Sequence, residues 1–245
     1  MLSNPKQTKN KLVNWIRDYF KENGPKATAV IGISGGKDST IAAALCAEAL
    51  GAWRVLGVMM PDGAQDADSE RVVEGLGIPH ITVQLSDVIE GVHQAVISAI
   101  APLTKQATIN LPPRIRMATL YAVAQSLSGG GRVVNTCNYS EDYVGYSTKF
   151  GDSAGDFSPL GGLTVEEVKQ IGYELGLPKD LVDKVPSDGL CGKTDEDNLG
   201  FTYKQLEDYI YAGTSGDMMV DRRISQLHEE NLHKLNPMPV FHTKD

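Results

Sequence analysis

The stretch Val30-Ile31-Gly32-Ile33-Ser34-Gly35-Gly36-Lys37-Asp38-Ser39 says most about the fold of this chain. The apolar residues before Ser34 predict a buried strand, and residues 40–50 predict a helix. A glycine turn therefore joins a strand to a helix N-terminus, where unpaired N–H groups and the helix dipole attract anions. Gly35 and Gly36 have no Cβ, so an anion can approach the backbone closely. The stretch predicts an anion-binding loop.

Asp38 indicates that a divalent cation takes part in this loop. A carboxylate would otherwise repel a bound phosphate, whereas it can serve as a metal ligand. The loop is not a Walker A motif, because Asp38 follows Gly36-Lys37 where Ser or Thr is required, and Ile31 occupies the place of the first glycine. It does not have the GxGxxG pattern either. The alternative is a glycine-rich turn that binds no ligand.

Apolar runs alternate with helical patterns over the first 135 residues. The strands are expected at 28–33, 54–60, 79–85 and 132–135, and the helices at 8–22, 68–76, 87–100 and 112–128. Asp87 with Glu90 predicts a capping box for the third of these helices, and Pro112-Pro113 predicts the start of the fourth. The alternation predicts an α/β fold with a parallel sheet sandwiched by helices. Ligands of such sheets bind at the carboxyl ends of the strands.

Loops and helices dominate beyond residue 150. Thr164 with Glu167 and Thr202 with Gln205 predict two capped helices, and a last helix is expected at 217–235. Residues 186–200 are polar and rich in glycine, which is typical of a functional lid or of a disordered loop.

The composition limits the class of protein. The 245 residues fit one α/β domain with a small helical extension, so a single domain over 1–245 is expected. The net charge of −8 argues against a nucleic-acid partner, whose backbone requires a basic surface. Three cysteines without a CxxC pair favour a reducing, cytoplasmic location. We expect no signal peptide and no segment long enough to span a membrane.

Three further motifs follow the loop. They are Arg114-x-Arg116-Met117, the segment from Thr136 to Glu141, and Thr148-Lys149-Phe150-Gly151-Asp152 with Asp156 beyond it. The loop resembles the pyrophosphate-binding loop of the ATP pyrophosphatases, which split ATP between its α and β phosphates. The order of all four motifs resembles the ammonia-dependent NAD synthetases, from Ser34 to near the C-terminus. The resemblance implies a ligase with the adenine nucleotide alpha hydrolase-like (ATP pyrophosphatase) fold.

The resemblance also implies a role for each site residue. ATP would contact Gly32, Ile33, Ser34, Gly35, Gly36, Lys37, Asp38, Ser39, Gln65, Thr136 and Ser187. Deamido-NAD (nicotinic acid adenine dinucleotide) would contact Arg116, Lys149, Asp156, His233 and Lys234. Mg²⁺ would be bound by Asp38 and Glu141, and these two residues with Lys37 would form the catalytic set. The chain departs from the family at two places. Val165 stands where the family usually has a lysine, and Lys193 could take over the role of that lysine. Met59-Met60 stands where the family often has an arginine.

The implied reaction is the ATP-dependent amidation of deamido-NAD by ammonia through an adenylated intermediate, giving NAD, AMP and pyrophosphate. It needs no side-chain nucleophile, in agreement with a sequence that has no recognisable Ser/His/Asp or Cys/His pattern. Because no room is left for a glutaminase domain, free ammonia or ammonia from a separate protein is the expected nitrogen source. Members of the family are homodimers. Two alternatives remain open, a tRNA-modifying ATP pyrophosphatase and a non-catalytic adenine-nucleotide-binding sensor.

Overall fold

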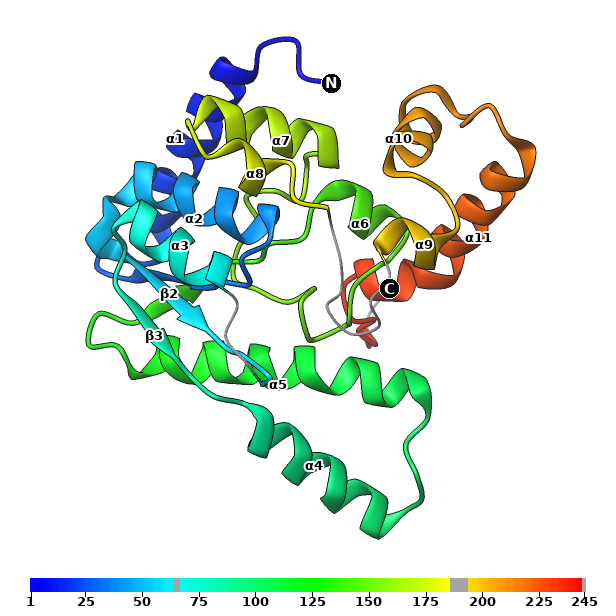
Figure 1. The fold of residues 1–245 in the computed structure, drawn as a ribbon, viewed down its shortest axis with the longest axis horizontal. Coiled ribbons are helices and arrows are strands. Elements are labelled where there is room, and N and C mark those ends of the chain that lie inside the picture. The colour runs from blue at the N-terminus through cyan, green and yellow to red at the C-terminus, as the bar shows by residue number, and fades with distance from the viewer. Residues whose placement is uncertain (64–66, 186–193, 244–245) are drawn as a thin grey trace.

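The computed structural model describes residues 1–63, 67–185 and 194–243. In this part of the chain a single parallel sheet has the strand order β3-β2-β1-β4. Two of its strands, β2 and β3, are labelled in Figure 1. The strands are β1 (Thr28–Gly32), β2 (Val55–Met59), β3 (His80–Thr82) and β4 (Gly131–Val133). The predicted parallel sheet is confirmed, and each strand is shorter than the sequence suggests. The strand that carries the glycine loop, β1, is central.

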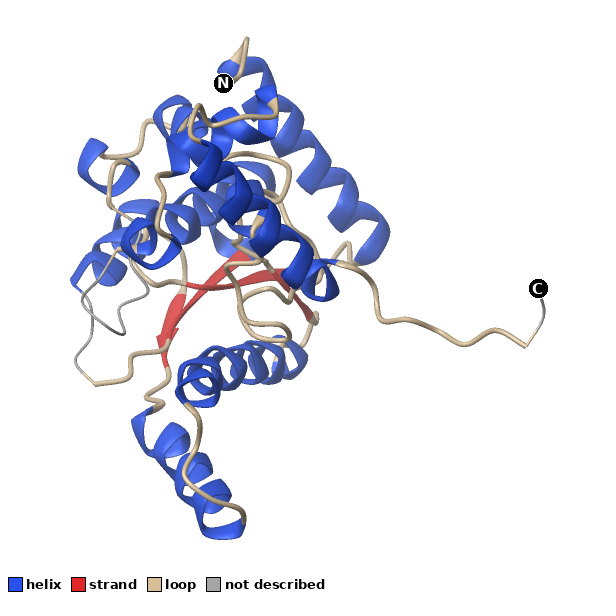
Figure 2. Cartoon of the chain, turned by 90° about the vertical axis from the view of Figure 1, so that its right-hand side faces the viewer, coloured by secondary structure: helices blue, strands red, loops and turns tan. Residues whose placement is uncertain are grey.

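Helices cover both faces of the sheet, as Figure 2 shows. On one face lie α1 (Pro5–Asn23), α2 (Lys37–Leu50), α3 (Ala67–Leu76) and α7 (Val165–Glu174), and on the other α5 (Lys105–Ser126). Successive side chains of a strand point to opposite faces, so neighbouring residues of β1 enter different cores. Ile31 packs with Phe20 and Ile41 on the first face, whereas Val30 packs with Leu120 on the second.

A smaller group of helices lies beside the sheet. It contains α6 (Tyr139–Tyr143), α9 (Asp195–Leu199), α10 (Tyr203–Ala212) and α11 (Met218–Leu235), seen on the right of Figure 1. Its apolar core includes Val144, Leu206 and Ile224. The remaining described elements are the short η1 (Ala52–Arg54) and α8 (Lys179–Val182) and the longer helix α4 (Ser86–Ala99).

Two of the predicted capping boxes are present. In α10, Thr202 N donates to Gln205 Oε1 at 3.0 Å and Gln205 N donates to Thr202 Oγ1 at 3.2 Å. In α7, Thr164 N donates to Glu167 Oε2 at 3.1 Å. The last helix begins after the N-cap Asp217, as the sequence predicts.

The predicted starts of α4 and α5 are wrong. Helix α5 begins at Lys105, because Thr104 Oγ1 accepts a hydrogen bond from Ala107 N at 3.2 Å and caps the helix there. Pro112 and Pro113 therefore lie inside α5, where each removes one backbone donor without ending the helix. Helix α4 begins at Ser86, so Asp87 is in its first turn and forms no capping box.

Candidate active site

The anion-binding loop connects the end of β1 to the start of α2. Gly35 has a φ of +74°, and a Cβ there would lie 2.9 Å from Ser69 N and 3.0 Å from Asp68 Cβ. Glycine is therefore required both by the backbone conformation and by the close approach of α3. The N-cap Gly36 makes no side-chain cap hydrogen bond, so the first amides of α2 can face an anion.

Two serine hydroxyls restrain the loop. Ser34 Oγ and Ser39 Oγ are 3.1 Å apart, and Ser39 Oγ donates to Gly36 O at 3.1 Å. Gly36 N donates to Ser34 Oγ at 3.2 Å. The loop is thus ordered by its own hydrogen bonds before a ligand arrives, which lowers the entropy cost of binding.

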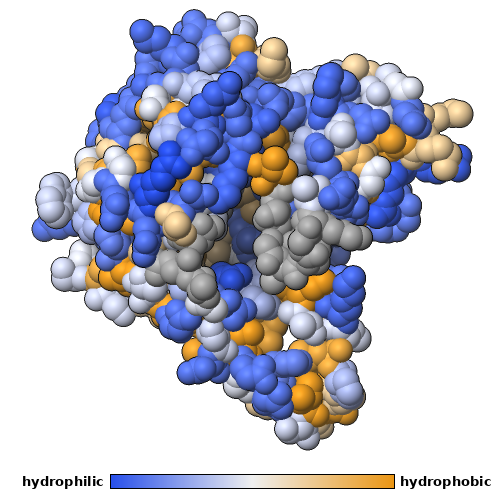
Figure 3. All heavy atoms as spheres, in the orientation of Figure 1, coloured by the Kyte–Doolittle hydropathy of each residue, from blue (hydrophilic) through white to orange (hydrophobic). Residues whose placement is uncertain are grey.

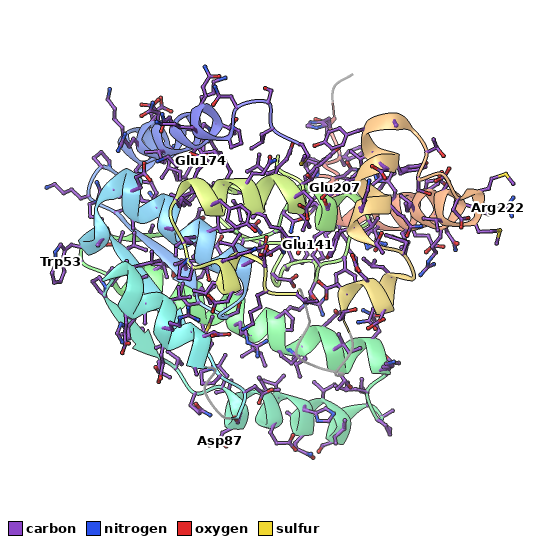
Figure 4. The ribbon with its side chains drawn as sticks, turned by 45° about the horizontal axis from the view of Figure 1, so that its top comes forward. Trp53, Asp87, Glu141, Glu174, Glu207 and Arg222 are labelled. Carbon is purple, nitrogen blue, oxygen red and sulfur yellow. The ribbon has the colours of Figure 1, made fainter. Side chains whose placement is uncertain are left out.

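Asp38 on α2 and Glu141 on α6 are connected by the buried side chain of Asn138. Asn138 Nδ2 donates to Asp38 Oδ1 at 3.2 Å, and Asn138 N donates to Glu141 Oε2 at 3.4 Å. Glu141 N returns a hydrogen bond to Asn138 Oδ1 at 3.1 Å, completing a capping box. In Figure 4, Glu141 lies between the sheet and the C-terminal helices.

Glu141 is buried beside Asp38, so water screens the repulsion between the two carboxylates poorly. Burial, and then the neighbouring charge of Asp38, raise the pKa of Glu141 well above its ordinary value. Lys37 acts in the opposite direction, with Nζ 2.6 Å from Asp38 Oδ2 and a side chain that is 1% exposed. Burial alone would lower the pKa of Lys37, but Asp38 and Glu141 outweigh it and raise this pKa. Lys37 is therefore charged and committed to Asp38.

These residues line a cavity of about 560 Å³. From the loop it includes Gly32, Ile33, Ser34, Gly36, Lys37, Asp38 and Ser39. Thr136 and Glu141 line it after β4, and Arg116 lines it from α5, with its Nε donating to Met60 O at 3.3 Å. Burial lowers the pKa of Arg116. Figure 3 shows a hollow between the sheet body and the C-terminal helices. The carboxyl ends of β1 and β4 thus meet at the site, as the sequence predicts.

The other residues expected to contact deamido-NAD are not among the side chains that line this cavity. Lys149 Nζ donates to His233 O, and Lys234 Nζ donates to Gly145 O at 2.7 Å and to Ser147 O at 3.0 Å. Three of the expected residues thus come together where the end of α11 meets the loop before residue 150.

Asp156 lies apart from that group, at β4. Its Oδ2 accepts a hydrogen bond from Val133 N at 2.7 Å, and its Oδ1 accepts one from Tyr121 Oη at 3.2 Å. Its backbone oxygen accepts a hydrogen bond from Tyr19 Oη at 3.1 Å. Gln65, Ser187 and Lys193 lie outside the described residues, as does much of the 186–200 segment.

Sequence reasoning missed several residues of the site, among them Asn138 and Asp195. Asn138 stands three positions before Glu141, which is the spacing of a capping box and could have identified it. Asp195 lines the cavity from α9, and its Oδ2 accepts a hydrogen bond from Tyr203 Oη at 3.2 Å. The signal was Thr194 with Asp197, a second capping pattern, which starts a helix inside the segment interpreted as a lid.

The donor set fits Mg²⁺ better than a metal bound by protein alone. Over residues 1–63, 67–185 and 194–243, no three His, Cys, Asp or Glu side chains are grouped to bind a metal ion. Mg²⁺ commonly takes one or two carboxylates together with substrate phosphates and water. Asp38 and Glu141 supply two mutually repelling carboxylates beside an anion-binding loop, and a cation between them would relieve the repulsion.

The sequence also matches known proteins over most of its length. The family model for NAD synthase matches residues 8–238. The chain belongs to the NAD synthase family. It is 37% identical over 229 residues to the NH(3)-dependent NAD(+) synthetase of Pyrococcus furiosus, covering 92% of this chain and 84% of the relative. It is 35% identical to that of Carboxydothermus hydrogenoformans, with 96% of each chain covered.

Two solved structures agree with this membership. The NMN synthetase from Francisella tularensis has a TM-score of 0.87 at 34% identity, covering 97% of this chain and 98% of that one. The NAD+ synthetase from Burkholderia pseudomallei has a TM-score of 0.79 at 27% identity, covering 96% and 91%. The family and the adenine nucleotide alpha hydrolase-like fold expected from the motifs are therefore confirmed.

Proposed function

We propose that this protein is an ammonia-dependent NAD synthetase, a ligase that amidates deamido-NAD with ATP and ammonia. The observation that carries the proposal is the pairing of Asp38 and Glu141 through Asn138, directly beside the Ser34–Ser39 loop, in a chain of this family. The match to NAD synthase over 8–238 disfavours a tRNA-modifying enzyme. The retention of Asp38, Glu141 and Lys149 together disfavours a non-catalytic nucleotide sensor.

The chemistry divides between the loop and the carboxylates. The loop binds the phosphates of ATP through backbone N–H groups and the hydroxyls of Ser34 and Ser39. Asp38 and Glu141 would hold Mg²⁺, which when bound neutralises negative charge on the phosphates. Lys37 forms an ion pair with Asp38, with Nζ 2.6 Å from Oδ2, and so positions this carboxylate beside the loop.

The reaction has two displacement steps. The nicotinate carboxylate attacks the α-phosphorus of ATP, the bond to the β-phosphate oxygen breaks, and pyrophosphate leaves. Ammonia then attacks the carbonyl carbon of the adenylate, loses a proton, and expels AMP, which leaves the amide. Arg116 is the cavity cation on the α5 side and is suited to the acidic acceptor.

We infer that Lys149, His233 and Lys234 bind the acceptor after their present contacts are exchanged. Both lysine ammonium groups now donate to backbone carbonyls. Asp156 is engaged by Val133 and Tyr121, which supports a role in positioning β4 for the acceptor.

A second candidate acceptor is nicotinate mononucleotide. The observation in its favour is the likeness to the NMN synthetase of Francisella tularensis, at 34% identity over 97% of this chain. The reaction at the carboxylate is the same, and only the adenylyl half of the acceptor is missing. The ratio of kcat/KM for the two acceptors, measured with ATP, Mg²⁺ and ammonium, decides between them.

We also propose a homodimer of single NAD synthetase domains in the cytoplasm. The match over 8–238 supports one domain, and the free thiols Cys46 and Cys137 are in keeping with a reducing compartment. None of the described helices has the length and apolar character needed to cross a membrane. Support for the dimer comes from α4, which has no buried residue although it carries Val88 and Val92.

The test of the function is an assay of all products together. With deamido-NAD, ATP, Mg²⁺ and ammonium, we expect NAD, AMP and pyrophosphate in equal amounts, and no NAD when ammonium is omitted. Pyrophosphate release without NAD or NMN would reject both acceptors. No pyrophosphate with either acceptor would reject the ATP chemistry itself.

A further inference from the structure

Lys184 lies at the edge of the anion-binding loop, a position that the sequence motifs do not mark. It follows α8 and lines the cavity together with Val185. Its Nζ donates to Gly35 O at 3.2 Å and forms an ion pair with Asp68 Oδ2 at 2.6 Å. The ammonium group is therefore already in contact with the backbone of the loop.

Among the residues that the structure describes, three cationic side chains line the cavity. They differ in how readily they could contact a ligand of the loop. Lys37 is 1% exposed and committed to Asp38. Arg116 Nε donates to the backbone oxygen of Met60, the residue that follows β2. The side chain of Lys184 is 33% exposed, and its carboxylate partner Asp68 is 35% exposed. Lys184 is thus the cavity cation that is both next to the loop and only partly withdrawn from water.

We propose that Lys184 binds the pyrophosphate end of ATP, exchanging the Asp68 carboxylate for a phosphate oxygen. The proposal rests on the proposed function only in taking ATP as the ligand of the loop. A partly exposed ion pair contributes little to stability, so its exchange for a phosphate costs little. Asp68 also keeps a cationic neighbour after the exchange, because Arg71 Nη1 lies 3.9 Å from its Oδ1.

Asp68 and Lys184 meet at Gly35 of the anion-binding loop, so exchange of their ion pair would bring the ammonium group to a phosphate bound there. Asp68 and Ser69 pack directly against Gly35, the glycine with positive φ. Lys184 Nζ contacts two of these residues, donating to the backbone oxygen of Gly35 and to the carboxylate of Asp68. A cation in this position neutralises charge on the pyrophosphate as it leaves, so Lys184 is expected to act on the triphosphate and not on the adenosine of ATP.

Binding of nucleotides by calorimetry tests this directly. The variants are Lys184→Gln, Lys184→Arg and, as a matched control, Lys179→Gln, an exposed lysine of α8. The probes are the Mg²⁺ complex of α,β-methylene-ATP, which cannot be cleaved at the α–β bridge, and AMP. We expect Lys184→Gln to lower the affinity for the triphosphate about tenfold or more, because one charge-assisted hydrogen bond is lost. AMP affinity should change less than twofold, Lys184→Arg should recover most of the loss, and Lys179→Gln should change neither.

Equal losses for the triphosphate and AMP would show that Lys184 only supports the loop, and an unchanged triphosphate affinity would show that it does not bind phosphate. Either result overturns the proposal. Asp68→Asn provides a second test, because it removes the competing carboxylate and should leave triphosphate affinity equal or higher; a loss there would also overturn it. These measurements need no acceptor, so a failure to form NAD would reject the proposed function without affecting them.

Discussion

Asp38 and Glu141 approach each other in a buried part of the cavity, where water screens their repulsion poorly. Lys37 and Asn138 offset part of it, with contacts to Asp38 of 2.6 Å and 3.2 Å. The pKa of Glu141 nevertheless stays raised by burial and by Asp38. At the scale of residues, this repulsion supports the proposal that the two carboxylates bind a cation together with phosphate.

Asp38→Ala should abolish turnover because it removes one of two carboxylates expected to bind Mg²⁺. We expect kcat to fall by at least about 100-fold, the usual effect of losing one charge-stabilising group. Asp208→Asn is the matched control, since Asp208 is paired with Lys204 within α10, away from the cavity. Near-normal activity of Asp38→Ala in a Mg²⁺ titration would reject its assignment as a ligand.

Gly35→Ala should damage ATP binding more than stability alone explains. An L-residue in the left-handed region costs about 1–2 kcal/mol. Here the Cβ would in addition lie 2.9 Å from Ser69 N. Gly213→Ala is the matched control, because Gly213 has a φ of +78° with open space around its Cβ position.

Thermal unfolding and nucleotide binding of the two glycine variants separate these effects. Both variants should lose stability from the backbone, whereas only Gly35→Ala should lose affinity for Mg²⁺-ATP. Equal affinity in both variants would contradict the role of the Gly35 turn in shaping the loop.

At the scale of elements, the sequence predicted well what depends on local pattern. The parallel strands, the loop at the end of β1, and the caps at Thr164 and Thr202 are all set by residues close in sequence. The start of α5 was mispredicted because Pro112-Pro113 is usual at a helix start, while the actual cap, Thr104, lies in a polar stretch without an apolar signal. The link from Asn138 to Asp38 joins residues 100 positions apart, so no local pattern could reveal it.

Helix α4 and the start of α5 form an arm on which we expect a second copy of the chain to pack. Figures 1 and 2 show α4 projecting from the body, and hydrophobic side chains appear on this arm in Figure 3. Val88 is 49% exposed and Val92 is 38% exposed. A second copy packed on this face would remove both from water, which is the main favourable term in stable association.

The double variant Val88→Asp/Val92→Asp should therefore reduce the oligomeric mass without unfolding the chain. Sedimentation equilibrium should give twice the chain mass of 26.4 kDa for the unaltered protein and one chain mass for the variant. Val240→Asp is the control, because Val240 is 64% exposed near the C-terminus and far in sequence from the arm. A variant that keeps the mass of the unaltered protein would place the interface elsewhere.

At the scale of the whole molecule, the sheet brings together residues from distant parts of the chain. The loop after β1 lines the cavity with Ser34 to Ser39 except Gly35, the segment after β4 supplies Glu141, and α5 supplies Arg116. The C-terminal helices close the cavity from the other side with Asp195. Because catalysis on this account is by positioning and charge, the molecule needs no covalent intermediate with a side chain.

The most direct measurement follows the oxygen atoms of the acceptor. The acceptor acid, deamido-NAD or nicotinate mononucleotide, is labelled with ¹⁸O in both carboxylate oxygens and converted with ATP, Mg²⁺ and ammonium, and the products are analysed by mass spectrometry. Attack of the carboxylate on the α-phosphorus predicts one ¹⁸O in AMP, one in the amide, and none in pyrophosphate. Amide formation with unlabelled AMP, or with the label in inorganic phosphate, would contradict the adenylated intermediate and the proposed reaction.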